Sequence, residues 1–300
     1  MIRHRISPAD LLAKIPQKWL GRAKSQTRKV IRARRVAEGD GIWSEIKSLY
    51  MELQGFKCMY CEKPMPREGA GGTAAGKVEY DVEHFRPKNR VTSWPTKEVK
   101  EKRGIDYAER LAMGETRGYV RLAFDPLNYG VSCKTCNSEL KGDRFPITGT
   151  TNSRMRDRAK LDEVERPCLL LPVGESGEDP EVWLEWLGPT VRARTDLDPD
   201  TMLRARALVD FLELDTRADL LFSRCTLVVL LWDELEQTHA AGDDGVRARE
   251  FVARMTDDAS YFAACARAFR KLYDADRPAA DRWRRLAREY VIAKDPAVFV

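Results

Sequence analysis

The sequence predicts an α+β fold that is predominantly helical, with a small strand-bearing core followed by a C-terminal α-helical region. Two cysteine pairs flank a polar stretch in which apolar and charged residues alternate over a few positions, as they do in a short strand. From Asp200 onward, apolar residues recur at helical spacing almost throughout. A chain of 300 residues, 43% of them hydrophobic, is long enough to bury one or two cores.

The first 40 residues are strongly basic. They hold 11 Lys/Arg and 3 Asp/Glu, a net charge of +8 (11 − 3), whereas the whole chain carries +5. We expect a basic arm or helix over residues 1–40 that contacts nucleic-acid phosphates, because each neutralised phosphate releases condensed counterions. A solvated helix face would give the same pattern, so the block alone favours neither interpretation.

Strands are expected where apolar residues alternate or cluster over a few positions, namely at residues 78–82, 119–124 and 182–186. The first strand leads to His84, and Pro87 then breaks the strand pattern. The second is the expected returning strand. Residues 89–118 are polar and are interpreted as an insertion between these two strands.

Helices are expected over residues 43–53, 107–113, 133–141, 200–212, 220–235, 244–273 and 278–291. Gly55 ends the first of these, and Gly142 ends the helix that starts at the second cysteine pair. Residues 66–77 form a loop by composition, because they are rich in glycine and alanine and carry no apolar period.

The two cysteine pairs are the most specific motif of the chain. They are Cys58-Met-Tyr-Cys61 and Cys133-Lys-Thr-Cys136. A Cys-x-x-Cys pair places two thiolates on one tight turn, and two such pairs supply the four sulfur ligands of a structural Zn²⁺ site. Redox-active pairs and buried thiols are the alternatives. The spacing therefore favours a structural zinc ion.

The three remaining cysteines, Cys168, Cys225 and Cys265, fall among apolar residues and are expected to be small core residues in a reducing compartment. The sequence has no run of 18 or more apolar residues and begins without an apolar signal region. We therefore expect a cytoplasmic location and no membrane partner.

Three consecutive motifs resemble those of the HNH nucleases, which use a ββα-metal motif. They are Asp81-Val-Glu-His-Phe-Arg-Pro-Lys88, Phe124-Asp-Pro-Leu-Asn128 and Cys133-Lys-Thr-Cys-Asn-Ser-Glu-Leu-Lys141. More narrowly, the chain is similar to the HNH proteins of retrons and Septu-type anti-phage systems. The likeness covers about residues 40–225, is strong over 58–146 and does not reach the last 75 residues.

His84 has the chemistry of a general base, because an imidazole with a pKa of about 6.5 is largely neutral at cytoplasmic pH. A lone histidine would more often be a satisfied surface or core group, but the flanking Glu83 and the cysteine pairs favour the base. The resemblance implies that Glu83 and Asn137 hold one divalent ion, Mg²⁺ or Mn²⁺, with Asp81 as a reserve ligand. It also implies that Asn128 constrains the loop and helps to orient His84.

Two departures from the family pattern accompany these assignments. The last family position is Asn137 rather than histidine, and the insertion at 89–118 separates the strands widely. Four cations surround the expected site and are candidate phosphate contacts, namely Arg86, Lys88, Lys141 and Arg144. Salt bridges to nearby basic residues are the alternative for the carboxylates, and solvated surface charges are the alternative for these four cations.

Together these expectations describe a zinc-stapled ββα-metal (HNH) core. A basic N-terminal arm or helix occupies residues 1–40, an HNH nuclease domain with the zinc site residues 41–150, and a mainly α-helical substrate- or partner-binding region residues 151–300. The expected activity is metal-dependent phosphodiester hydrolysis, with DNA favoured over RNA. The alternative is a non-catalytic zinc-bearing module that binds nucleic acid, or an interaction subunit of a defence complex with an ATPase partner.

Overall fold

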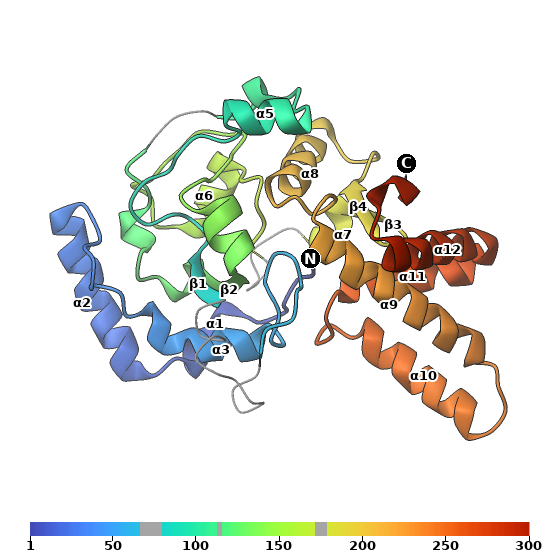
Figure 1. Ribbon diagram of the computed structural model, residues 1–300. Coiled ribbons are helices and arrows are strands. Elements are labelled where there is room, and N and C mark those ends of the chain that lie inside the picture. The colour runs from blue at the N-terminus through green and yellow to red at the C-terminus, as the bar shows by residue number, and fades with distance from the viewer. Residues whose placement is uncertain (67–79, 113–115, 172–178, 300) are drawn as a thin grey trace.

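The computed structural model describes residues 1–66, 80–112, 116–171 and 179–299, and in this part the fold is mostly helical with two small antiparallel sheets. Helix α2 lies along one edge of the molecule, the β1–β2 hairpin lies near the centre, and helices α9–α12 lie on the opposite side (Figure 1). The predicted α+β fold with a helical C-terminal region is thereby confirmed in outline.

The basic N-terminal segment forms two helices, α1 (Pro8–Lys14) and α2 (Gln17–Ala33). Ser7 caps α1 by accepting a hydrogen bond from the backbone of Asp10 at 3.0 Å. Trp19 of α2 is buried and donates its indole N–H to the carbonyl of Ile42 at 2.8 Å. This contact fixes α2 to the start of the next segment.

The predicted helix over residues 43–53 is confirmed as a 3-10 turn, η1 (Trp43–Ile46), that continues into α3 (Lys47–Leu53). Strand β1 (Tyr80–His84) follows, so His84 is the last residue of the strand. The predicted loop from residue 67 onward and the first two residues of the predicted strand lie outside the described residues.

The returning strand is β2 (Tyr129–Cys133), and the prediction of residues 119–124 was wrong. In that predicted stretch the chain forms a 3-10 turn, η3 (Val120–Leu122), and a second turn, η4 (Pro126–Asn128), precedes β2. Strands β1 and β2 pair antiparallel, with Glu83 opposite Gly130 and His84 opposite Tyr129. A Cβ at Gly130 would lie 2.2 Å from Met59 Sδ, so only glycine lets the first cysteine turn pack this closely.

The helix predicted at the second cysteine pair is confirmed as η5 (Thr135–Lys141), a π-helix that ends at Gly142. The insertion between the strands contains α5 (Lys97–Arg103) and a 3-10 turn, η2 (Ala108–Arg110), rather than a helix over residues 107–113. Helix α5 buries no residue and is delimited by Thr96 at its start and Gly104 at its end, so apolar periodicity could not reveal it.

The C-terminal region begins with α6 (Arg158–Glu165) and α7 (Pro180–Trp183), followed by a second hairpin of β3 (Leu184–Leu187) and β4 (Thr190–Ala193). The predicted strand at 182–186 is therefore half helix and half strand. Helix α8 (Pro199–Phe211) then leads to a bundle in which the very apolar α9 (Ala218–Gln237) packs against the last three helices.

These last helices are α10 (Asp243–Thr256), α11 (Ala263–Ala275) and α12 (Arg277–Ala293), followed by the 3-10 turn η6 (Pro296–Phe299). The single helix predicted over residues 244–273 is two helices, because residues 257–262 form a connecting turn. No helix in the described ranges combines the length and apolar character needed to cross a membrane.

Two buried contacts join the cysteine-bearing segment to the C-terminal helices. Lys57 donates to the backbone carbonyls of Asp258 and Ser260 at 2.5 and 2.6 Å. Arg217, at the start of α9, donates to Cys136 Sγ at 3.2 Å. The three cysteines predicted to be core residues, Cys168, Cys225 and Cys265, are all fully buried.

Candidate functional site

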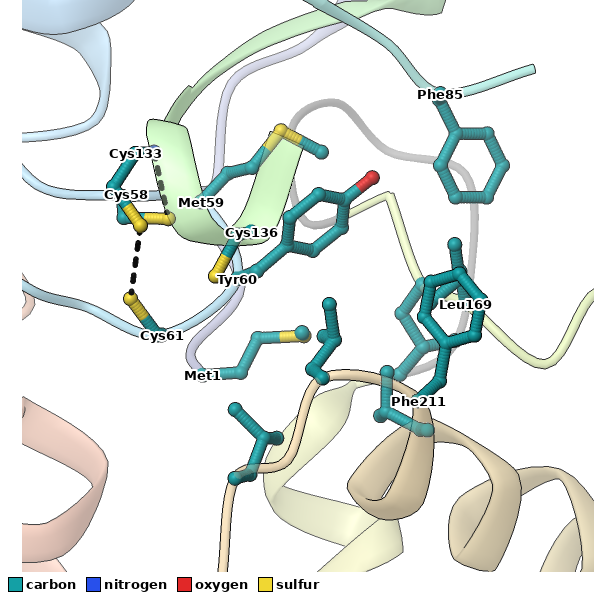
Figure 2. Packing of buried hydrophobic residues seen from close by; sticks show 14 of the residues in the cluster. Met1, Cys58, Met59, Tyr60, Cys61, Phe85, Cys133, Cys136, Leu169 and Phe211 are labelled. Carbon is teal, nitrogen blue, oxygen red and sulfur yellow. Dashed lines mark hydrogen bonds between the residues drawn. The ribbon is translucent and has the colours of Figure 1, made fainter. Parts of the chain in front are cut away.

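The four paired cysteines converge as the sequence predicts. The Sγ atoms of Cys58, Cys61, Cys133 and Cys136 all lie within 4.8 Å of one another, and all four residues are buried. Figure 2 shows the four side chains gathered beside Tyr60, whose hydroxyl points away from them. Among the described residues this is the one group of three or more Cys, His, Asp or Glu ligand atoms so close together.

The spacing of these sulfurs fits a tetrahedral zinc site. Metal–sulfur bonds of about 2.3 Å at tetrahedral angles place neighbouring sulfurs about 3.8 Å apart. The Cys61 and Cys133 Sγ atoms lie 3.7 Å apart. All four sulfurs are buried, and burial disfavours a charged thiolate, so thiolates here require a compensating cation. The donor set and its burial are consistent with a structural Zn²⁺ ion.

Arg217 supplies a hydrogen bond to this sulfur cluster from outside the ligand set. Its Nη1 lies 3.2 Å from Cys136 Sγ, and its other donors are held by Asp219. A donor to a ligand sulfur orients that ligand and offsets the negative charge of four thiolates around one Zn²⁺. Sequence reasoning missed Arg217, because it lies 81 residues after Cys136 and no local spacing marks it.

His84 is held in one orientation by a backbone carbonyl. Its Nε2 lies 3.0 Å from the Ala123 carbonyl oxygen, which also accepts a hydrogen bond from the Tyr129 hydroxyl at 2.5 Å. A carbonyl only accepts, so Nε2 carries the proton of the neutral ring and Nδ1 carries the lone pair. Within the described part of the chain, Nδ1 has no hydrogen-bond partner.

The surroundings of His84 keep its ring neutral. The rings of Trp43 and Tyr129 lie edge-on to it, with centroids 4.7 and 4.9 Å away, and the residue is 6% exposed. Burial lowers the pKa of His84 well below its usual value, and the charges of Lys88 and Lys141 lower it further. A neutral imidazole with one free lone pair is the form that a general base requires.

Asn128 lies where it can hold the loop that follows His84. Its Oδ1 accepts from the backbone N–H of Arg86 at 3.0 Å, and its Nδ2 donates to the carbonyls of Arg86 and Leu122 at 3.1 and 3.3 Å. The side chain is fully buried. These bonds tie the loop after β1 to the turn before β2, and the orienting of His84 by Asn128 stays a prediction.

Glu83 is buried and paired with a cation from η5. Its Oε1 lies 2.5 Å from Lys141 Nζ, which also donates to the backbone carbonyl of His84 at 3.0 Å. Glu83 and Lys141 are each no more than 2% exposed at the side chain. Burial raises the pKa of Glu83, against the opposing charge of Lys141. A divalent ion at Glu83 would therefore compete with the Lys141 ammonium for the same carboxylate.

The other expected metal ligands are Asp81 on β1 and Asn137 on η5. Asp81 is partly exposed and forms an ion pair with Lys134 at 3.6 Å. Asn137 lies on η5 directly after Cys136, and its side-chain amide makes no hydrogen bond within the described residues. A carboxylate and an amide are donor types that Mg²⁺ accepts, and here the carboxylate of Glu83 is already paired with Lys141.

The four expected phosphate contacts separate into two kinds. Arg86 is 1% exposed and bonds to Asp162 and Glu165 at 2.7 and 2.9 Å, and Lys141 is bound to Glu83. Because both cations are buried and paired with acids, neither is available to bind a phosphate.

Lys88 remains a candidate phosphate contact, whereas Arg144 is engaged by backbone carbonyls. Lys88 is half-buried, with Nζ 4.9 Å from the centre of the Trp43 ring. Arg144 covers the end of η5, where it donates to the carbonyls of Leu140 and Glu139 at 2.6 and 3.1 Å. Comparisons with models of protein families, with curated proteins and with solved structures give no match, so the HNH resemblance rests on the sequence motifs alone.

Proposed function

We propose that this chain is a metal-dependent HNH endonuclease that hydrolyses phosphodiester bonds in nucleic acid, with DNA favoured over RNA, and that it serves bacterial anti-phage defence. The observation that carries the proposal is the state of His84. Its ring stands at the end of β1, its tautomer is set by the Ala123 carbonyl, and its Nδ1 is left with a free lone pair.

The proposed reaction is hydrolysis by an activated water. Nδ1 of His84 takes a proton from the water as the water oxygen bonds to phosphorus, and the bond from phosphorus to the 3′ oxygen breaks. A divalent ion held by Glu83 and Asn137 would supply positive charge beside the phosphate and the leaving oxygen. Asn128 and Ala123 keep the imidazole in place, and Lys88 lies where it can pair with a phosphate oxygen.

The zinc site supports this proposal through structure rather than chemistry. Four thiolate ligands close the coordination sphere of a structural zinc ion and leave no position for a substrate. The cysteines join the turn at 58–61 to the β2–η5 junction, and thereby hold the strand that ends in His84 beside the helix that carries Asn137. Metal binding at such a site contributes directly to folding.

The test is incubation of the purified protein with plasmid DNA and with total RNA, each with Mg²⁺ and with EDTA. Cleavage that needs Mg²⁺ and is lost in His84→Ala, at unchanged zinc content and unchanged unfolding midpoint, is the expected result. A general base contributes about 10²–10⁴-fold in rate, so the loss should be of that size or larger. Undiminished cleavage by His84→Ala would refute the assignment.

A second candidate is favoured by the Glu83–Lys141 pair. Because Lys141 already neutralises Glu83, the same core could act as a non-catalytic platform that binds nucleic acid or docks on an ATPase subunit of a defence complex. Absence of cleavage by the isolated chain, followed by cleavage once a partner is added, would support the interaction subunit. Absence of cleavage under both conditions, with nucleic-acid binding retained, would support the platform.

A further inference from the structure

Helix α2 presents one continuous basic face to solvent. With about 100° of rotation per residue, the buried Trp19, Ala23 and Val30 fall within a sector of about 40°. The six cations of the helix fall within about 160° on the opposite side, and they are Lys18, Arg22, Lys24, Arg28, Lys29 and Arg32. All six are exposed. The side that faces away from the core is therefore mostly cationic and carries no acid.

Most of these cations form no ion pair with another described residue. Arg22 pairs with Glu45, and Lys29 pairs with Asp40. In the described part of the chain no hydrogen bond or ion pair engages the remaining four, Lys18, Lys24, Arg28 and Arg32. Helix α2 contains no acidic residue at all. Lys18 lies close enough to Glu45 to help lower the pKa of that carboxyl, after Arg22, and Lys24, Arg28 and Arg32 have no such partner among the described residues.

This charge pattern does not stabilise the helix. A helix N-terminus favours negative side chains, yet the first turn of α2 has none and carries Lys18. Like charges three or four residues apart repel by a few tenths of a kcal/mol each, about 0.2–0.5. A face whose like charges repel, and most of whose cations form no ion pair within the described residues, fits an external polyanion.

The basic face is rigidly joined to the candidate catalytic loop. Just beyond α2, the backbone N–H of Val36 donates to Asn89 Oδ1 at 2.8 Å, and Asn89 Nδ2 donates to the Val36 carbonyl at 3.0 Å. Asn89 directly follows Lys88, the cation beside Trp43 and His84. Helix α2 also packs against η3, the turn that leads to Ala123.

A groove continues the positive charge from α2 toward the same turn. It encloses about 280 Å³ and is lined by Lys24 of α2 and by Arg121 and Arg156. Leu122 and Phe124, which flank Ala123, line its wall. Asp125 is the single acid in the lining, and it lies 4.0 Å from Arg158. Cations therefore line the groove between α2 and the turn next to Ala123, the residue whose carbonyl orients His84.

We propose that the exposed face of α2, with Arg121 and Arg156, binds the phosphate backbone of duplex DNA and directs it to His84. The delivery of the DNA to His84 rests on the proposed nuclease function, whereas the binding of the DNA requires no catalysis. A helix of 17 residues spans about 25 Å, over which a duplex presents about 15 phosphate charges. Its one aromatic residue, Trp19, is buried, so α2 offers no surface for stacking unpaired bases.

The test compares two triple variants of equal charge change by fluorescence anisotropy with labelled duplex DNA, without added divalent ion. One is Lys24→Glu/Arg28→Glu/Arg32→Glu on α2, and the control reverses three exposed cations on α10 and α12, namely Arg254→Glu/Arg282→Glu/Arg288→Glu. The slope of log affinity against log salt concentration decreases in magnitude by about 0.9 for each lost phosphate contact. The α2 variant should therefore show a slope smaller in magnitude by about 2–3. The control should keep the slope of the wild type.

Equal losses in both variants would show a general charge effect, and no loss in the α2 variant would show a solvated face; either result overturns the inference. Single-stranded DNA or phosphatidylserine vesicles that bind as tightly as the duplex, with the same dependence on α2, would overturn the assignment to duplex. Retained α2-dependent binding without any cleavage would count against the nuclease function alone. Cleavage that is insensitive to the α2 variant would count against this surface alone.

Discussion

At the scale of single residues, the candidate base and its supporting amide could be predicted from the motifs, but the groups that fix them could not. His84 and Asn128 stand in short, recognisable stretches of sequence. Ala123, whose carbonyl orients His84, contributes only its backbone, so its residue type carries no signal. Arg86 and Lys141 looked like free cations, because a sequence does not reveal that their acidic partners are buried beside them.

The Glu83–Lys141 pair leads to a prediction on stability. Lys141→Met should destabilise the protein by about 3–5 kcal/mol, because it leaves a buried carboxylate without its counterion. The double variant Lys141→Met/Glu83→Gln removes both charges and should recover a large part of that loss. Denaturant unfolding of the two single variants and the double variant measures the coupling. A double variant whose loss equals the sum of the two single losses would show that the pair is not coupled.

His4 provides a prediction on pH dependence. Burial, with a further contribution from the charge of Lys57, lowers the pKa of His4 to about 3 in the folded protein. An unfolded histidine has a pKa of about 6.5, so between these values the unfolded state binds a proton that the folded state excludes. The free energy of unfolding should therefore fall as the pH drops below about 6.5, by up to about 1.4 kcal/mol per pH unit from this residue.

Replacing His4 removes this contribution and should flatten the dependence. Denaturant unfolding of the wild type and of His4→Gln between neutral pH and about pH 5 should give curves that converge as the pH falls. The comparison uses the slope with pH and not the stability at one pH, so a general loss of packing in the variant does not affect the conclusion. Parallel curves for the two proteins would show that His4 takes up its proton equally in the folded state.

At the scale of elements, the cysteine turns and η5 could be predicted because their spacing carries chemistry, whereas the second strand could not. Residues 119–124 are more apolar than residues 129–133, and apolar content predicted the wrong strand. The true strand includes Gly130, which β-propensity disfavours and which the close approach of Met59 requires. Such a requirement arises from packing between segments distant in sequence, which periodicity does not record.

The contact of Arg217 with Cys136 gives a prediction on metal affinity. Arg217→Met removes a donor to a ligand sulfur and should lower zinc affinity by about 10–100-fold, the usual size of such an effect. Competition with a chromogenic zinc chelator measures the change. Arg192→Met, which removes an exposed arginine paired with Glu185, is the matched control and should leave zinc affinity unchanged. Equal zinc affinity in the two variants would show that Arg217 does not act on the metal site.

At the scale of the whole molecule, the C-terminal helices support the cysteine-bearing core as well as packing on themselves. Lys57 and Arg217 join the two regions through buried polar contacts, one to the turn after α10 and one from the start of α9. The division into residues 41–150 and 151–300 stays a prediction. Basic charge gathers on α2, at the opposite side of the molecule from α9–α12 (Figure 1). We therefore expect nucleic acid to bind on the side of α2, and a partner to bind on the side of α9–α12.

Anomalous diffraction from crystals soaked in Mn²⁺ would decide whether the divalent-ion site expected of an HNH nuclease is present in this chain. We expect one anomalous peak from zinc at the four Sγ atoms and a second from Mn²⁺ at Glu83 and Asn137, with Lys141 displaced from the Glu83 carboxylate. A peak at the cysteines alone, with Lys141 still paired to Glu83, would contradict the proposed catalytic site.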